Sequence, residues 1–253
     1  MKPIRVGLGQ INPTVGDFSA NLRKILSFLA LASEKRCDLL VFPELAVSGY
    51  PVWDLAIKKS FIRESLRSVG AIVGASRRFK GAVIVGFLDE GPAGSGKSRN
   101  ALAWIEGGRV RLRQYKSLLP TYDVFLEQIF FEPGLEHPTL SWKGLRVGTA
   151  ICEDLWDTNY TRKPLRILAR EGAKLVILGA ASLPEYQPTP ASAQVFNDLA
   201  LGYRVHATLM ASPRVRGSAL DVRAEGGRIH VKGRIDHEAL EDEVVNLVKM
   251  YRV

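Results

Sequence analysis

Three polar residues stand at the ends of apolar segments, and their side chains could together form a catalytic set. Glu44 closes the run LLVFPE, Cys152 closes the run LRVGTAIC, and Lys116 ends a segment with a strand pattern. A thiol of ordinary pKa is mostly protonated near neutral pH, so it needs a base to take its proton and a cation to hold the charge. Glu44 could be that base, and Lys116 with a backbone amide just after Cys152 could stabilise the oxyanion of an attacked amide. The set therefore indicates amide hydrolysis through a covalent intermediate.

Each of these residues also has an ordinary structural interpretation when it is taken singly. Glu44 could cap a helix or form a loop salt bridge, Lys116 could be a solvated lysine, and Cys152 could be a buried structural thiol. A papain-like pair of Cys152 with His206 is a further alternative. The combination favours the Glu-Lys-Cys interpretation, because the three residues together supply the nucleophile, the base and the cation that the reaction needs.

The segment 91–98, GPAGSGKS, matches the P-loop pattern GxxxxGK[ST] and raises a nucleotide-binding alternative. A P-loop works only where a helix begins at its end, because the helix N-terminus holds the phosphates. The residues after Lys97 read ALAWI and then reach Gly107 and Gly108, which is typical of a strand entering a hairpin turn. We therefore interpret residues 91–98 as a Gly/Ser-rich hairpin loop.

Composition favours one soluble globular domain over residues 1–253. The 46% hydrophobic content suffices for a substantial core, and the chain has no apolar run of about 18 residues that could span a bilayer. The opening residues enter a strand pattern too early for a signal peptide. Two cysteines, Cys37 and Cys152, are too few for a disulfide framework and lack metal-ligand spacing. We expect a cytoplasmic protein without metal or organic cofactor and without a membrane association.

The net charge of +9 does not by itself indicate a nucleic-acid-binding protein. Lysine and arginine recur in ones and twos along the chain, often beside acidic residues, whereas a nucleic-acid site needs them clustered on one face. We interpret the charge as a solvated basic surface and expect no nucleic-acid partner.

Hydrophobic periodicity predicts strands that alternate with helices, which is typical of an α/β fold. The predicted strands cover residues 4–10, 38–42, 82–88, 101–105, 109–115, 145–152, 174–178, 207–212, 219–222 and 228–232. The predicted helices cover residues 21–35, 60–76, 163–171, 191–206 and 238–251. A carboxylate at the end of a sheet strand, as at Glu44, occupies the usual place of a ligand site in such a fold.

Five segments in order resemble the nitrilase, or carbon–nitrogen hydrolase, superfamily, and within it the glutaminase domain of glutamine-dependent NAD synthetases. They are QINPTVGD at 10–17, FPELAVSGYP at 42–51, KSLLPTY at 116–122, FEPG at 131–134 and CEDLW at 152–156. The resemblance implies a four-layer αββα sandwich and a homo-oligomer. It makes Glu44 the general base, Lys116 the oxyanion-stabilising lysine and Cys152 the nucleophile that forms a thioester. It also makes Glu127 the second glutamate, near the lysine, where its charge would keep Lys116 protonated.

The same resemblance implies a substrate pocket but leaves the substrate open. We expect this pocket to be lined by Tyr50, Tyr122, Glu153, Trp156 and Ser182. The family's stretch after this point contains a lysine or arginine that grips the amino acid, whereas here none lies between Lys174 and Arg204. We predict a hydrolase that acts on glutamine or a related small aliphatic amide and releases ammonia. Because the chain resembles only the ammonia-producing half of those synthetases, a subunit that docks on a separate synthetase is the alternative.

Overall fold

The computed structural model describes residues 3–121, 125–157, 160–181, 219–225, 228–234 and 239–249, together with Val205, Leu209, Ser212 and Val215. The chain divides into two compact units. The first comprises Met1–Leu119 and Phe130–Pro184, and the second comprises Pro120–Ile129 and Glu185–Val253.

A five-stranded mixed sheet forms the centre of the first unit. Its strands lie in chain order: β1 (Val6–Leu8), β2 (Leu39–Val41), β3 (Ala82–Glu90), β4 (Ser98–Glu106) and β5 (Arg109–Tyr115). β1, β2 and β3 pair in parallel, whereas β3, β4 and β5 pair antiparallel. The parallel strands β1 and β2 therefore present their carboxyl ends at one edge of the sheet, and the chain that follows β2 carries Glu44.

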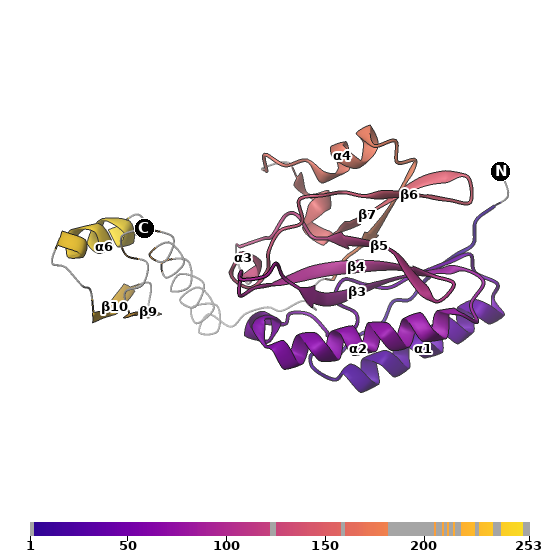
Figure 1. Ribbon diagram of the computed structural model, residues 1–253, viewed down its shortest axis with the longest axis horizontal. Coiled ribbons are helices and arrows are strands. Elements are labelled where there is room, and N and C mark those ends of the chain that lie inside the picture. The colour runs from indigo at the N-terminus through magenta and orange to yellow at the C-terminus, as the bar shows by residue number, and fades with distance from the viewer. Residues whose placement is uncertain are drawn as a thin grey trace. The chain divides into compact units, whose positions relative to one another are not determined.

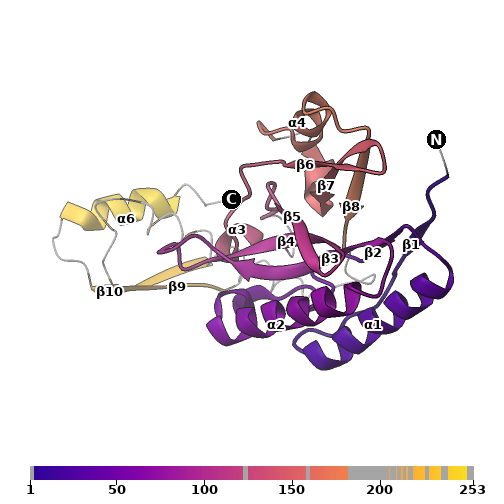
Figure 2. The ribbon, with the colours of Figure 1, turned by 45° about the vertical axis from the view of Figure 1, so that its right-hand side comes forward.

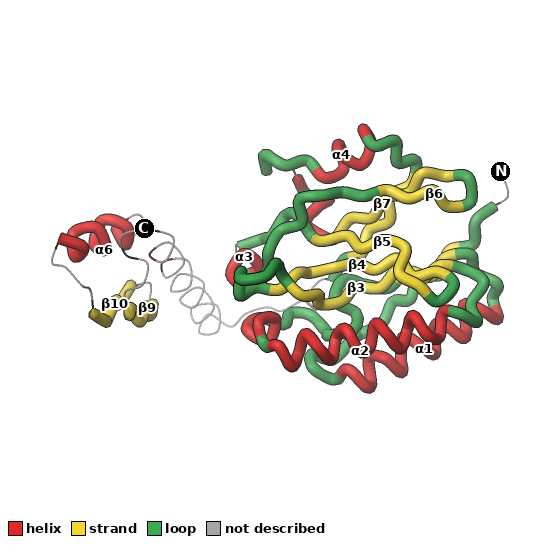
Figure 3. Tube along the Cα trace, in the orientation of Figure 1, coloured by secondary structure: helices red, strands yellow, loops and turns green. Residues whose placement is uncertain are grey.

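Two amphipathic helices, α1 (Phe18–Glu34) and α2 (Lys59–Ser76), cover one face of this sheet. Figures 1 and 3 show them lying side by side beneath β3 and β4. Their buried residues, Ile25, Leu29 and Ile72 among them, pack in one cluster with Phe42 and alternate residues of the strands. Burial of apolar surface of this kind is the main favourable term in folding.

The opposite face of the five-stranded sheet packs on a second sheet of three strands. These are β6 (Thr139–Trp142), β7 (Leu145–Ile151) and β8 (Leu175–Gly179), in that order, with β7 and β8 parallel. A cluster that includes Leu102 and Trp104 from the first sheet and Val147 from the second fills the space between them. Helix α4 (Pro164–Arg170) lies beyond the second sheet (Figures 1 and 2), where Leu168 packs over Gly148. The layers are therefore αββα, as predicted.

The second unit contains a β-hairpin and a helix. β9 (Ala219–Glu225) pairs antiparallel with β10 (Arg228–Arg234), and α6 (Ala239–Lys249) contributes Val244, Leu247 and Val248 to a cluster with hairpin residues. The short helix α3 (Glu127–Phe130) crosses the boundary of the two units. Two 3-10 helices, η1 (Trp53–Ile57) and η2 (Cys152–Leu155), belong to the first unit.

Most predicted elements are confirmed, and the differences have local causes. Residues 91–97 connect β3 to β4, and Ser98 begins a strand where a P-loop would need a helix. β6 was not predicted, because four residues give too little periodicity. The strand predicted over 207–212 is wrong at Leu209, which is helical. The helix predicted over 191–206 lies outside the described residues except at Val205.

Among the described residues, no helix combines the length and the hydropathy needed to cross a membrane. Within the same part of the chain, no group of three or more histidine, cysteine, aspartate and glutamate side chains could hold a metal ion.

Candidate active site

Glu44 is fully buried, and both oxygens of its carboxylate accept hydrogen bonds. Oε1 accepts from Lys116 Nζ at 2.8 Å and from Asn100 Nδ2 at 2.7 Å. Oε2 accepts from the backbone N–H of Ala181 at 3.1 Å. The loop that carries Glu44 lies close on β3, where a side chain at Gly86 would meet the backbone of Leu45 at 2.3 Å. The carboxylate is therefore held in one orientation from three directions.

Lys116 follows β5 directly, and its side chain is only 1% exposed. A buried ammonium group is tolerated only where a partner offsets the loss of hydration, and here the partner is the Glu44 carboxylate. The lysine backbone is fixed as well, because its N–H donates to Asn100 O at 2.9 Å and its carbonyl accepts from Gly134 N at 2.8 Å. The buried pair joins the loops after β2 and β5.

Cys152 lies at the sharp turn from β7 into η2 and is partly buried. Its φ of +43° is a left-handed conformation, which costs a residue with a side chain on the order of 1–2 kcal/mol. The Sγ atom lies 3.9 Å from the carbonyl oxygen of Ala181. Ala181 therefore contacts Cys152 through its carbonyl and Glu44 through its N–H. A strained turn that presents a side chain at the end of a strand is a feature of functional sites.

Asp154 lies two residues beyond Cys152 and is fully buried. Its Oδ1 accepts from the backbone N–H groups of Ser117 at 3.0 Å and Leu118 at 2.9 Å, and its Oδ2 accepts from Ile151 N at 3.1 Å. Burial raises the pKa of this carboxyl to about 6, although the three backbone donors and the nearby Lys116 charge act to lower it.

Gln114, Ser117 and His137 form a buried cluster of polar side chains, and the first two lie close to Lys116 in the chain. Ser117 Oγ donates to Gly134 O at 2.6 Å and lies 3.2 Å from His137 Nε2, while Gln114 Nε2 lies 3.4 Å from His137 Nδ1. Burial, with a smaller contribution from the charge of Arg162, lowers the pKa of His137 below its ordinary value. The His137 ring thus contacts residues on either side of the lysine.

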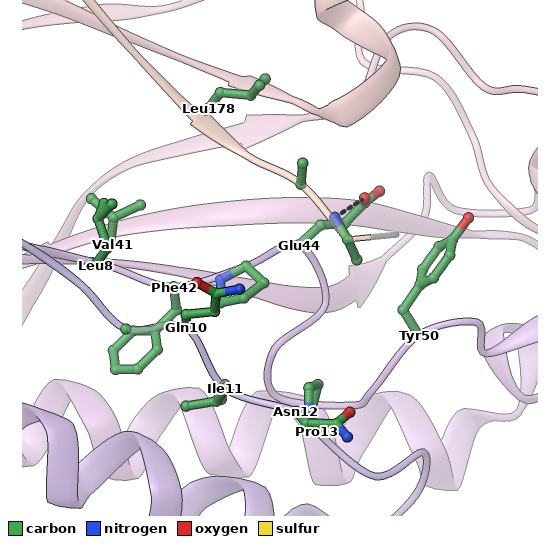
Figure 4. Close-up of a pocket in the computed structure, with 14 residues that line it drawn as sticks. Leu8, Gln10, Ile11, Asn12, Pro13, Val41, Phe42, Glu44, Tyr50 and Leu178 are labelled. Carbon is green, nitrogen blue, oxygen red and sulfur yellow. Dashed lines mark hydrogen bonds between the residues drawn. The ribbon is translucent and has the colours of Figure 1, made fainter. Parts of the chain in front are cut away.

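A pocket of about 400 Å³ opens beside Glu44, at the carboxyl ends of β1, β2 and β8. Glu44 and Tyr50 stand at one end of it and the apolar Leu8 and Val41 at the other (Figure 4). Its lining is Leu8, Gly9, Gln10, Ile11, Asn12, Pro13, Val41, Phe42, Pro43, Glu44, Tyr50, Leu178, Ala180 and Ala181. The pocket offers a polar end and an apolar body to a small ligand.

The remaining residues predicted for the site differ in burial and in their contacts. Glu153 is buried and accepts a hydrogen bond from the Tyr160 hydroxyl at 2.8 Å, whereas Trp156 is 63% exposed. Glu127 begins α3 and belongs to the second unit, so its predicted approach to the lysine stays a prediction. The predictions for Tyr122 and Ser182, and the alternative through His206, fall outside the described residues.

Sequence reasoning missed three contributors to this site: Asn100, Asp154 and Ala181. Asp154 could have been found as a second carboxylate two residues beyond the cysteine, whereas Asn100 follows the polar Ser98 and Arg99 and does not stand out in the sequence. Ala181 acts through its backbone and leaves no signal in its residue type.

Comparison with known proteins gives relatives in one family. The chain is 39% identical over 157 residues to the glutamine-dependent NAD(+) synthetase of Thermotoga maritima, which is 62% of this chain and 27% of that protein. It is 33% identical over 187 residues to the glutamine-dependent NAD(+) synthetase of Synechocystis sp., which is 70% of this chain and 34% of that protein. The chain thus spans about a quarter to a third of the length of these relatives.

Solved structures share the fold. Glutamine-dependent NAD+ synthetase from Acinetobacter baumannii matches with a TM-score of 0.63 at 24% identity, over 92% of this chain and 41% of that one. A mutant of the Nesterenkonia AN1 amidase from the nitrilase superfamily matches with a TM-score of 0.63 at 23% identity, over 79% and 72%. The carbon-nitrogen hydrolase family model matches residues 5–202, which is well over half of the chain. The chain therefore belongs to the carbon-nitrogen hydrolase family.

Proposed function

We propose that the chain hydrolyses a carboxamide with Cys152 as nucleophile, Glu44 as general base and Lys116 as the cation that stabilises the oxyanion. The observation that carries this proposal is the fixed carboxylate of Glu44, which is bound to Lys116 Nζ at 2.8 Å and linked to the Cys152 turn through Ala181. A base must be held in a fixed position relative to the proton it abstracts, and three hydrogen bonds fix the orientation of the Glu44 carboxylate, which supports this role.

The reaction has two balanced steps. In the first, Glu44 takes the thiol proton, the sulfur forms a bond to the amide carbonyl carbon, and the carbon–nitrogen bond breaks as the proton passes to the leaving nitrogen. Ammonia leaves and a thioester on Cys152 remains. In the second, Glu44 takes a proton from water, the hydroxide attacks the thioester, and the carboxylic acid leaves as the thiol is restored. No electron acceptor is required, because neither carbon nor sulfur changes oxidation state overall.

Charge develops on the carbonyl oxygen in both steps, and two groups are suited to stabilise it. They are the Lys116 ammonium and the backbone N–H of Glu153, which follows the nucleophile. Donors that are already fixed before the reaction need no reorganisation as the charge forms, so they favour the transition state over the ground state. We propose that Glu127 contributes by keeping the lysine protonated.

The proposed substrate is glutamine or a related small aliphatic amide. The relatives are glutamine-dependent enzymes, and the pocket beside Glu44 has the size and the mixed lining of a small-ligand site. We propose that its walls include Tyr50, with Tyr122, Glu153, Trp156 and Ser182 completing the substrate site. We further propose that both units form one hydrolase domain over residues 1–253.

Ammonia release tests the proposal. The purified chain is incubated with a panel that contains glutamine, asparagine, acetamide, propionamide and butyramide, and ammonia is measured for the wild type and for Cys152→Ala. The proposal expects release from at least one amide by the wild type and loss of it in the variant. Cys37→Ala is the matched control, because Cys37 packs against the α1 and α2 core cluster and should leave the rate unchanged. Equal release by Cys152→Ala would remove the proposal.

A second candidate function is an ammonia-supplying subunit that docks on a separate synthetase. Support for it comes from the relatives, which are glutamine-dependent NAD(+) synthetases. This candidate expects low ammonia release by the chain alone and a rise when a synthetase partner is added. Full activity of the chain by itself, with no change on addition of partner, would count against it.

A further inference from the structure

The proposed lysine and cysteine are carried by different sheets. Lys116 follows β5 of the five-stranded sheet, whereas Cys152 follows β7 of the three-stranded sheet. The apolar cluster between the two sheets is non-directional, so it attracts the sheets without fixing where one loop stands relative to the other. A reaction whose groups must be held within a fraction of an ångström needs a directional link across that interface.

The carboxylate of Asp154 forms such a link. Its Oδ1 binds the N–H groups of the two residues after Lys116, which are Ser117 and Leu118. Its Oδ2 binds the N–H of Ile151, the residue before Cys152, so that it closes the first turn of η2. One rigid, fully buried planar group thus holds the backbone after the lysine and the backbone before the nucleophile.

We propose that Asp154 is a positioning residue that holds the Lys116 loop and the Cys152 turn at the separation the reaction requires. This inference rests on the proposed function, because it gives Asp154 a task in the same reaction. A cap for η2 alone would need only the bond to Ile151, whereas the two bonds to Ser117 and Leu118 cross from one sheet to the other. In the proposed reaction Glu44 is the base, and Asp154 acts only through the backbone groups that it binds.

The test compares Asp154→Asn and Asp154→Ala with Asp38→Asn. Asparagine keeps the shape and one acceptor oxygen, so it retains part of the link, whereas alanine removes all of it. Asp38 is a matched control at the amino end of β2, away from Glu44. Its carboxylate also joins the two sheets, through Arg5 N at 2.8 Å and Lys143 Nζ at 2.7 Å. Folding of each variant is checked by circular dichroism and thermal unfolding.

The main readout is the rate at which iodoacetamide alkylates Cys152 as a function of pH, mapped by peptide mass because Cys37 is also a free thiol. This rate reports the thiolate and its neighbouring cation without needing a substrate. We expect a loss on the order of tenfold to a hundredfold at pH 7 in Asp154→Ala, a smaller loss in Asp154→Asn and a thiol titration moved to higher pH. Asp38→Asn should alkylate as the wild type does. With an accepted amide, kcat should fall much more than KM changes.

A folded Asp154→Ala with the alkylation profile of the wild type would overturn the proposal. So would failure of both Asp154 variants to fold while Asp38→Asn folds, because Asp154 would then act in folding. Alkylation that depends on Asp154 in a protein that releases no ammonia from any amide would support the positioning role and remove the proposed function. Ammonia release that persists unchanged in Asp154→Asn and Asp154→Ala would support the proposed function and overturn the positioning role of Asp154.

Discussion

The buried pair of Glu44 and Lys116 is the residue-scale feature on which the proposed chemistry depends. Removing one partner of a buried ion pair leaves an uncompensated charge and costs roughly 3–5 kcal/mol of stability, whereas replacing both is close to neutral. We expect Glu44→Gln to lower the free energy of unfolding and to lower kcat by about 10²–10⁴-fold. The double variant Glu44→Gln with Lys116→Met should recover stability but not activity. Urea unfolding and ammonia release measure the two quantities, and an active double variant would contradict the assigned roles.

The raised pKa of Asp154 predicts that the stability of the protein depends on pH. Its pKa in the folded protein is raised to about 6 from an ordinary value of 3.8, so the folded state holds this proton more tightly than the unfolded state does. Its contribution to stability is therefore fully present below about pH 4 and is lost as the pH rises through about 6, by roughly 3 kcal/mol for about two pKa units. Asp154→Asn should lack this slope.

The difference between the unfolding free energies of the wild type and Asp154→Asn isolates the pH-dependent contribution of Asp154 to stability. Asp17 and Asp38 have pKa values below their ordinary value, because hydrogen bonds stabilise their ionised forms, and they make stability fall as the pH drops. These contributions are common to both proteins and cancel in the difference. Urea titrations at several values between pH 4 and 7 give the curve, and a flat difference would show that Asp154 keeps an ordinary pKa.

The sequence was sufficient to single out Glu44, Lys116 and Cys152 as candidates, because each stands at the end of a predicted strand and together they supply a base, a cation and a nucleophile. The structure brings Glu44 and Lys116 into contact. Asn100 and Ala181 were beyond sequence reasoning, since their contacts depend on strand pairing and on a backbone N–H. Asp154 was visible as a residue, but its task depends on two backbone groups some 36 residues away in the chain.

At the scale of elements, the loop after β2 must lie close on β3 for Glu44 to reach its partners. Gly86 permits this approach, because an added Cβ would meet Leu45 N at 2.3 Å and Pro43 O at 2.4 Å. We expect Gly86→Ala to displace the loop, to lower stability and to reduce ammonia release more than tenfold. Gly70→Ala is the matched control.

Gly70 is exposed in α2 and has open space where a Cβ would be added. Alanine there should raise stability by about 0.5–1 kcal/mol and leave the rate unchanged, because glycine is unfavourable inside a helix. Thermal unfolding measures the stability of Gly86→Ala and Gly70→Ala, and ammonia release measures their rates. Gly86→Ala with normal stability and rate would show that the loop can shift without moving the carboxylate.

Element boundaries were predicted less well than element types. The first helix begins at Phe18 and not at residue 21, because Asp17 caps it by accepting from Ala20 N at 2.9 Å. Apolar periodicity alone starts at the first buried residue, Asn21 or beyond, and does not register a cap. The hairpin of β3 and β4 was predicted correctly, since the glycine-rich loop before β4 and the glycine pair after it mark both ends of that strand.

At the scale of the whole molecule, the layers could not be predicted from periodicity. β3 is buried at eight of its nine positions, so it carries no alternation that would say which face meets helices and which meets the second sheet. The αββα arrangement was expected from family resemblance, and the structure and its relatives confirm it. The relation of fold to function then depends on the loops at one end of the sandwich.

The choice of substrate depends on which charged residues the whole chain can bring to the site. Between Lys174 and Arg204 the sequence has no lysine or arginine to pair with the α-carboxylate of glutamine. A lost charge-assisted contact is worth about 1.5–3 kcal/mol, or roughly tenfold to over a hundredfold in affinity. We therefore expect butyramide, which has the glutamine side-chain amide without its charged groups, to be hydrolysed with a kcat/KM at least equal to that of glutamine. A large preference for glutamine would show that another cation supplies the contact.

A covalent thioester at Cys152 is the central requirement of the proposed function. The wild type is mixed with an accepted amide, quenched in acid within the first turnovers, digested with pepsin and analysed by peptide mass. We predict that the peptide with Cys152 gains the mass of the acyl group, while the peptide with Cys37 does not, and that the gain disappears in Cys152→Ala. Ammonia release without any acyl group on Cys152, or with the group on another residue, would contradict the account.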